Sequence, residues 1–231
     1  MTAFSFYIPG TDLDGVRDIA HRLKIPNAEL DEAFLSESPQ HLLTARYESG
    51  VRYIALRLSE PAESYTRDDL IKICRWCEAN YAEAVLFNNP GNSAERAADI
   101  IETTDCFRLK TVFENTNASF LRSVNDMDVF FRNKRQICLC FNPAEMASQR
   151  VHPFLSALNG QTYRRQLFML RAEDRRFNGC AVLPAHGDAE LMEIRSSAAA
   201  FGLNTWISLS PYAHFTLDEI KTAACEEICK I

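Results

Sequence analysis

Hydrophobic positions along the chain group into short, nearly continuous apolar runs. Two clear examples are Ile137–Phe141 and Leu167–Leu170. Continuous apolar runs are typical of strands that are covered on both faces, as in parallel sheets. The pattern predicts these strands: Phe4–Ile8, Ala28–Ala33, Val51–Ser59, Ala82–Asn88, Lys110–Asn115, Gln136–Asn142, Arg165–Leu170 and Thr205–Leu209.

Helical patterns occupy the segments between these strands. Leu70, Ile73 and Cys77 have the i, i+3, i+7 spacing of a buried helix face. Thr216, followed three residues later by a glutamate, has the capping-box spacing of a helix start. Strands that alternate with helices predict a parallel sheet, and a parallel sheet of eight strands can close. We therefore expect an α/β fold, a single (β/α)8 TIM barrel over residues 1–231, with an open doubly wound sheet as the alternative.

Composition narrows the class of protein. The chain has 231 residues, of which 47% are hydrophobic and 24% charged, so it can bury a core and is not disordered. No apolar run approaches the roughly 18–20 residues of a membrane span. The net charge of −6 argues against a nucleic-acid surface, and the first residues lack a secretory pattern, so we expect a cytoplasmic protein. No dinucleotide-binding or P-loop glycine pattern follows the first strand.

The 8 cysteines allow more than one interpretation. Cys74 and Cys77 form a C-x-x-C in a predicted helix, which is compatible with a redox pair or with half of a zinc site. No second C-x-x-C or paired histidine motif completes a zinc site. In a reducing compartment, small apolar packing residues are the favoured interpretation for all 8.

Candidate chemistry lies at the carboxyl ends of the strands, where the active sites of TIM barrels are found. Glu114 directly follows an apolar run, and a buried carboxylate is costly unless it is paired, protonated or bound to a metal. We predict Glu114 as a general base, and a salt bridge to Arg57 is the structural alternative. His186, in Pro-Ala-His-Gly-Asp, is predicted as a proton shuttle or metal ligand, although loop histidines often only cap or hydrogen-bond.

Four further polar residues near strand ends are candidate substrate contacts. Asn88 and Asn142 each offer a donor and an acceptor, which suits a ligand rich in hydroxyl groups. Asparagine at strand ends is also ordinary turn chemistry. Arg57 and Arg171 are predicted to bind substrate as well.

An ordered series of motifs runs from about residue 80 to the end. Thr-Val-Phe-Glu114-Asn and Leu-Cys-Phe-Asn142-Pro are apolar runs closed by polar residues. Leu-Pro-Ala-His186-Gly-Asp precedes a helix, and Phe-Gly-Leu-Asn-Thr-Trp-Ile-Ser208-Leu contains the final strand. This series resembles the xylose-isomerase-like TIM-barrel superfamily, the group of sugar isomerases, sugar epimerases and endonuclease IV. Glu29 resembles a glutamate often found there at the second strand.

The resemblance implies a divalent metal, Mn, Co, Mg or Zn, held by a Glu, an Asp, a His and a second Glu. The two Glu residues of that set also move the proton during the reaction. Carried over by position, only Glu114 survives in this chain. Asn142, Glu145, Leu170 and Ser208 take the places of the other ligands, so the metal site is expected to be degenerate.

Two hypotheses follow. The first is a diverged sugar isomerase or epimerase that uses Glu114 as base and His186 as its partner. The second is a non-catalytic carbohydrate-binding barrel that has lost the metal. Both imply a small carbohydrate ligand and neither nucleic acid nor membrane as partner, and a homodimer is compatible with the group. A DNA repair nuclease is disfavoured, because the 5 histidines are scattered.

Without a cation, the acidic residues at the strand ends must find another partner. Some of them would be protonated, or paired with Arg57 or Arg171. The carboxylates expected at this end of the barrel are Glu29, Asp31, Glu114, Glu145 and Glu173.

Overall fold

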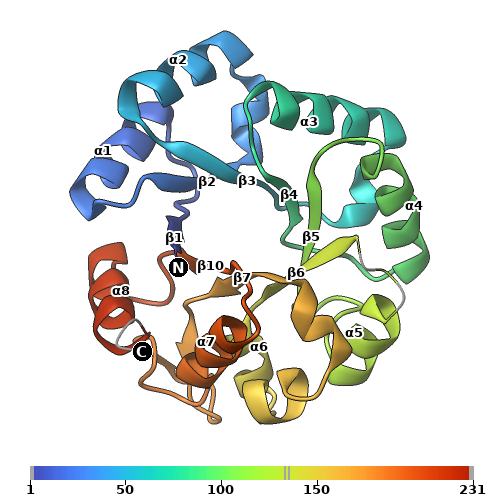
Figure 1. Cartoon of the computed structure of the whole chain (residues 1–231), viewed down its shortest axis with the longest axis vertical. Coiled ribbons are helices and arrows are strands. Elements are labelled where there is room, and N and C mark those ends of the chain that lie inside the picture. The colour runs from blue at the N-terminus through green and yellow to red at the C-terminus, as the bar shows by residue number, and fades with distance from the viewer. Residues whose placement is uncertain (1–2, 133, 135, 229–231) are drawn as a thin grey trace.

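The computed structural model describes residues 3–132, 134 and 136–228. Eight parallel strands form a closed barrel with the neighbour order β1-β10-β7-β6-β5-β4-β3-β2, and helices surround it (Figure 1). The expected (β/α)8 barrel is therefore confirmed, and the open sheet is excluded by the pairing of the first strand with the last. The barrel strands are β1 (Ala3–Phe6), β2 (Asn27–Asp31), β3 (Arg52–Leu58), β4 (Ala84–Phe87), β5 (Lys110–Glu114), β6 (Ile137–Phe141), β7 (Leu167–Arg171) and β10 (Trp206–Leu209).

Every α-helix of the described residues except α7 begins at a side-chain cap. Thr66 and Thr216 each form a complete capping box, and Ser93 accepts a hydrogen bond from the backbone of the third residue of its helix. The α-helices are α1 (Leu13–Leu23), α2 (Pro39–Ser49), α3 (Arg67–Ala79), α4 (Ala94–Thr104), α5 (Val124–Phe131), α6 (Pro143–Ser148), α7 (Leu191–Ala200) and α8 (Leu217–Ala223).

Shorter elements complete the chain. A two-stranded antiparallel hairpin, β8 (Asp174–Arg175) and β9 (Ala181–Val182), follows β7. Helical turns η3 (Pro153–Leu158) and η4 (Thr162–Gln166) lie between α6 and β7, and η5 (Ala224–Ile228) continues α8. Among the described residues, no helix is both long and apolar enough to cross a bilayer.

The core has two layers, as the alternation of strand side chains requires. The larger layer lies between the sheet and the helices and includes Phe87 and Phe113, whose rings stack at 5.1 Å. The smaller layer fills the inside of the barrel. Its members are Ile54, Ala55, Ala84, Leu86, Val112, Cys140, Phe168 and Met169, all buried.

The cysteines do not share one role. Cys74 and Cys77 are buried in α3, and burial raises the pKa of both thiols, that of Cys74 to about 12. A reactive pair needs the opposite shift, so this C-x-x-C has the environment of a packing element. The expectation that all cysteines are packing residues is nevertheless wrong, because some are exposed, and Cys229 lies outside the described residues. The exposed cysteines are Cys106, Cys180 and Cys225.

Candidate functional site at the carboxyl ends of the strands

A polar layer lies directly above the apolar layer inside the barrel. Side chains two residues apart on a strand point to the same side, so most of these polar residues follow an inward apolar one. Val112 is followed by Glu114, Cys140 by Asn142 and Met169 by Arg171. The polar layer consists of Ser5, which donates to Glu29 Oε1 at 2.9 Å, and of Glu29, Arg57, Asn88, Glu114, Asn142, Arg171 and Ser208.

Arg171 occupies the centre of this layer and is fully buried. Its Nε and Nη2 atoms donate to Glu114 Oε2 at 3.0 and 2.7 Å, and its Nη1 donates to Glu29 Oε2 at 2.7 Å. Nη1 also donates to the Ser208 hydroxyl. One guanidinium from β7 therefore joins side chains of β2, β5 and β10.

Arg57 provides a second positive charge beside the first. Its Nη2 donates to Asn88 Oδ1 at 2.6 Å, and its nitrogen atoms lie 3.9 Å from carboxylate oxygens of Glu29 and Glu114. The guanidinium carbon lies 3.8 Å from the centre of the Tyr7 ring, which is cation–π geometry. The Arg57 side chain is only 9% exposed, so little of it is open to solvent.

Glu114 has few free lone pairs. Besides Arg171, its Oε2 accepts from the Cys140 thiol at 3.7 Å, and its Oε1 accepts from Asn142 Nδ2 at 3.4 Å. The salt bridge expected as the structural alternative for Glu114 exists, but its principal partner is Arg171 and Arg57 is second. A carboxylate with this many donors is a weak general base.

Two charges of each sign balance within this layer. Burial disfavours the ionised form of Glu29, yet the charges of Arg171 and Arg57 outweigh it and lower the Glu29 pKa below its usual range. Burial likewise opposes the charge of Arg171, and the surrounding anions reverse this and raise its pKa. Both shifts favour the ionised forms of Glu29 and Arg171, in keeping with the expected pairing of mouth carboxylates with arginines.

Glu173 is the carboxylate that the arginines do not neutralise. It follows β7, lies half-buried, and its Oε2 accepts from Asn142 Nδ2 at 3.5 Å. Burial and the nearby charge of Glu114 raise its pKa above the usual value. The sequence places Glu173 at this mouth but assigns it no role, because the shift of its pKa depends on neighbours from other strands.

Comparison with known proteins supports the fold. No family model matches the chain, and no curated protein matches its sequence. A D-tagatose 3-epimerase-like protein aligns with a TM-score of 0.78 at 12% identity, covering 98% of this chain and 97% of the other. A xylose isomerase-like TIM barrel protein from Mycobacterium smegmatis in complex with magnesium aligns at 0.68, with 9% identity and coverage of 98% and 97%. Endonuclease IV from Thermus thermophilus aligns at 0.65, with 12% identity and coverage of 99% and 97%.

The chain has the fold of the xylose isomerase-like TIM barrels. The alignments cover nearly the whole length of both partners, so the short chain retains every strand–helix unit of the architecture. At these identities the likeness establishes the fold and leaves the chemistry to the site.

The donor set of this barrel does not fit a divalent cation. Glu29 and Glu114 already hold the Arg171 guanidinium, and a metal ion beside it would add repulsion between like charges. Within the described residues, no group of three or more His, Cys, Asp or Glu side chains is arranged to hold a metal. Glu145, which takes the place of one ligand of the resemblance, is already engaged: its Oε2 accepts from the Asn117 backbone N–H at 2.8 Å.

The strand-seven position needs a correction. The resemblance placed the residue that replaces the family histidine at Leu170. In the structure Leu170 faces the helical layer, and Arg171 is the residue that faces the interior. A shift of one residue on a strand exchanges the two faces, so the sequence alignment assigned an apolar residue where the barrel has a cation.

His186 does not join the polar layer. It is exposed in the loop between β9 and α7, where its backbone N–H donates to Leu183 O at 3.0 Å. No contact joins it to Glu114 within the described part of the chain, so its predicted partnership with that carboxylate has no geometric support here.

Asp174 anchors the loop that contains this histidine. Its carboxylate is buried and accepts the backbone N–H groups of Gly187 at 2.9 Å and Ala189 at 3.0 Å. Burial raises the pKa of Asp174 to about 6, although these hydrogen bonds lower it. The carboxylate thereby fixes the loop after β9 against the β8–β9 hairpin.

Proposed function

We propose that this protein is a non-catalytic barrel that binds a small carbohydrate at the carboxyl ends of its strands without a resident metal. The observation that carries the proposal is the Arg171 guanidinium held between Glu29 and Glu114. It provides fixed positive charge in the polar layer where the resemblance expects a metal. The fold neighbours include a protein named as epimerase-like, which supports a carbohydrate as the class of ligand.

The ligand contacts would come from the rim above this cluster. Asn142 and half-buried Asn88 and Glu173 offer amide and carboxyl groups, and Arg57 lies between them and the buried ion pairs. The Glu173 carboxyl, whose pKa burial raises, accepts hydrogen bonds and in its protonated form also donates one, which matches the two-way hydrogen bonding of a sugar hydroxyl. The predicted ligand contacts are therefore Arg57, Asn88 and Asn142, while Arg171 acts through Glu114 and stays out of reach of solvent.

The isomerase hypothesis places a different demand on the same residues. It needs Glu114 to take a proton from a sugar carbon, and a second acid–base group on the opposite side of that carbon. Glu114 is bound to Arg171, and the last-strand position holds Ser208, whose hydroxyl also accepts from Arg171. The geometry thus favours binding over proton transfer.

Binding and turnover can be measured on the same preparation. A panel of aldoses, ketoses and sugar acids is titrated by calorimetry, with and without chelator, and epimerisation is followed with added Mn²⁺, Co²⁺, Mg²⁺ or Zn²⁺. We expect saturable binding that chelator does not change, and no turnover. Metal-dependent epimerisation that falls in Glu114→Gln would overturn the proposal in favour of the isomerase.

A matched pair of rim variants locates the site. Glu173→Leu keeps most of the volume and removes both the donor and the acceptor, so we expect weaker sugar binding by about tenfold, the effect of losing one good hydrogen bond. Asn89→Ala is the control, because the Asn89 side chain bonds the backbone of Gly91 in its own loop at 3.2 Å. Equal loss in both variants would place the ligand elsewhere.

A further inference from the structure

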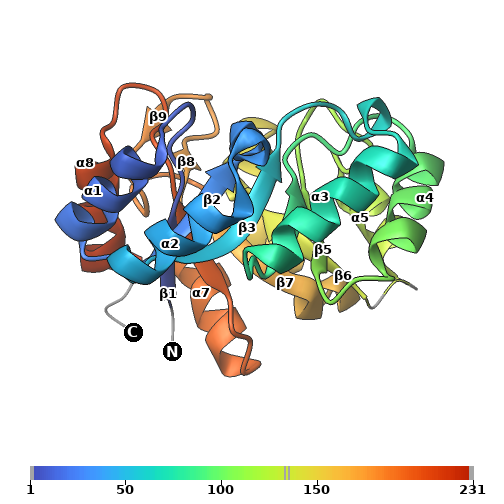
Figure 2. The same cartoon turned by 90° about the horizontal axis from the view of Figure 1, so that it is seen from above.

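A cavity of about 230 Å³ lies between helix α7 and the outer face of strands β7 and β10. It is on the opposite side of the sheet from the polar layer. Its lower end is formed by the turn that joins α7 to β10, and Leu167 at the start of β7 contributes to its wall. Figure 2 shows α7 extending beyond the neighbouring helices on the side of the chain termini.

The walls of this cavity combine hydrocarbon with polar groups. Leu167 and Leu170 of β7 and Ile207 of β10 form its apolar side, and Asn204 and Thr205 of the turn before β10 contribute polar groups. The space stays open because Ala198 and Ala199 of α7 are too small to fill it. The other side of α7 is closer packed: the space between it and η3 is only about 10 Å³.

Arg195 is the charged residue among those that line this cavity. It comes from the middle of α7, and its Nε is buried without a hydrogen-bond partner among the described residues. No ion pair or hydrogen bond of Arg195 occurs anywhere in the part of the chain that the structure describes. A buried guanidinium nitrogen without an acceptor is costly, and an acceptor brought by a ligand would remove that cost.

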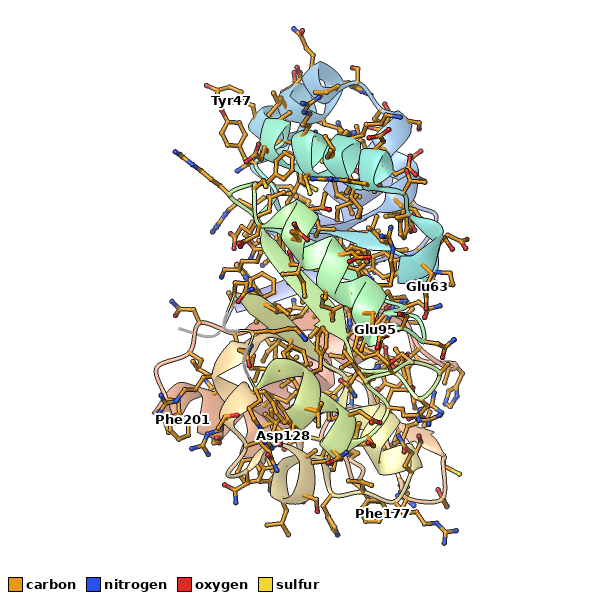
Figure 3. All side chains as sticks on the ribbon, turned by 90° about the vertical axis from the view of Figure 1, so that its right-hand side faces the viewer. Tyr47, Glu63, Glu95, Asp128, Phe177 and Phe201 are labelled. Atoms are coloured by element: carbon orange, nitrogen blue, oxygen red, sulfur yellow. The ribbon has the colours of Figure 1, made fainter. Side chains whose placement is uncertain are left out.

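A second arginine beside the same helix does have a partner. Arg164 lies on the other side of α7, and its guanidinium carbon is 4.0 Å from the centre of the Phe201 ring. Figure 3 shows Phe201 at the surface. Arg164 therefore has an aromatic partner beside the same helix, whereas the Arg195 guanidinium lines the cavity without one.

We propose that the cavity beside α7 binds a small organic carboxylate with an apolar body, its carboxylate paired with Arg195. The edge of a guanidinium matches the two oxygens of a carboxylate, and one positive charge balances one negative charge. A phosphate would place further charged oxygens against Leu167 and Leu170. The volume suits a ring-sized ligand, since a cavity of about 150 Å³ takes up benzene.

Benzoate and its neutral analogue benzamide are the probes for this proposal, titrated into the intact chain by NMR or calorimetry. We expect benzoate to bind at least tenfold more tightly than benzamide, because only the carboxylate completes the Arg195 contact. Arg195→Met keeps the aliphatic stem and should lose that preference, and Arg195→Lys should restore part of it. Benzoate binding that is equal in Arg195→Met and wild type, or absent at about 10 mM, would overturn the proposal.

A matched pair of helix variants tests the location. Ala199 lines the cavity, whereas Ala200 is its exposed neighbour outside the lining. Ala199→Leu should weaken benzoate binding at least tenfold, and Ala200→Leu should leave it unchanged. Loss in both, or in neither, would contradict the assignment. This site is independent of the carbohydrate proposal, and Glu173→Leu should not change benzoate binding.

Discussion

Arg171 and Arg195 place the same side chain in two opposite situations. Arg171 is fully buried inside the barrel and donates four hydrogen bonds to Glu29, Glu114 and Ser208. Arg195 lies outside the sheet beside a cavity, and its buried Nε has no partner among the described residues. The first guanidinium is part of the structure, because its removal would leave charges without partners. The second is available to a ligand, because nothing in the described chain uses it.

The difference teaches where to search for function in this barrel. Charged residues at the strand ends attract attention first, yet here most of their bonding capacity is used internally. The outer face of the barrel beside α7 has fewer sequence signals, but Arg195 provides a hydrogen-bond donor there that has no partner among the described residues. Predictions on the two arginines therefore separate structural charge from binding charge.

Replacing Arg171 should have the largest effect. Arg171→Met leaves the carboxylates of Glu29 and Glu114 buried with only Arg57 nearby at 3.9 Å. We expect a loss of about 3–5 kcal/mol in the free energy of unfolding, the usual cost of breaking a buried ion pair on one side. Urea unfolding followed by circular dichroism measures it. A variant as stable as wild type would show that the cluster is not structurally important.

The partners should be coupled. Glu114→Gln removes one anion while Arg171 keeps Glu29 and Ser208, so we expect a smaller loss of about 2 kcal/mol. The double variant should be more stable than the sum of the single effects predicts, by about 1–3 kcal/mol, because residues in one network are not additive. Additive effects would mean that the two side chains act separately.

The cost of losing Arg171 should depend on pH. In wild type the Glu29 pKa is lowered, so the stability it contributes is present above the ordinary carboxyl range and is lost as pH falls through it. In Arg171→Met the unpaired carboxylates favour their protonated forms, so acid stabilises that variant. Both effects reduce the difference in the free energy of unfolding between wild type and Arg171→Met, by about 1–2 kcal/mol from pH 8 to pH 4. A difference in stability that does not change with pH would contradict the interpretation that these side chains are ionised.

Replacing Arg195 should have the smallest effect on folding. Arg195→Met removes no hydrogen bond or ion pair among the described residues and removes the buried Nε that has no acceptor, so we expect no loss of stability and a gain of about 1 kcal/mol. A thermal unfolding scan without ligand, beside one with benzoate, separates stability from binding. A loss as large as that of Arg171→Met would place Arg195 among the structural residues.

The sequence predicted the barrel because its signals are local and repeated. Every barrel strand overlaps a predicted apolar run, and capping residues such as Thr66 and Thr216 mark helix starts. The same regularity predicted which end of the barrel collects the carboxylates. Local pattern was enough because each strand–helix unit repeats the same arrangement.

The residues of the site were predictable from the sequence, but which of them pair with each other was not. The sequence offered Glu114, Arg57 and Arg171 as candidates, and pairing between mouth carboxylates and arginines was expected. It could not show that Arg171 is the central partner, because that depends on which face of β7 points inward. Nor could it show that Arg195 is unpaired, because an unsatisfied donor is defined by the whole of its surroundings.

The reach of Arg171 has a consequence for how the chain folds. Its partners lie 142, 57 and 37 residues away in sequence, on strands β2, β5 and β10. Before β7 is in place, a growing sheet would bury Glu29 and Glu114 beside each other without this cation. A partial barrel is thereby penalised, and long-range contacts of this kind slow folding. The guanidinium thus favours cooperative closure of the barrel, and partly folded barrels are expected to be sparsely populated.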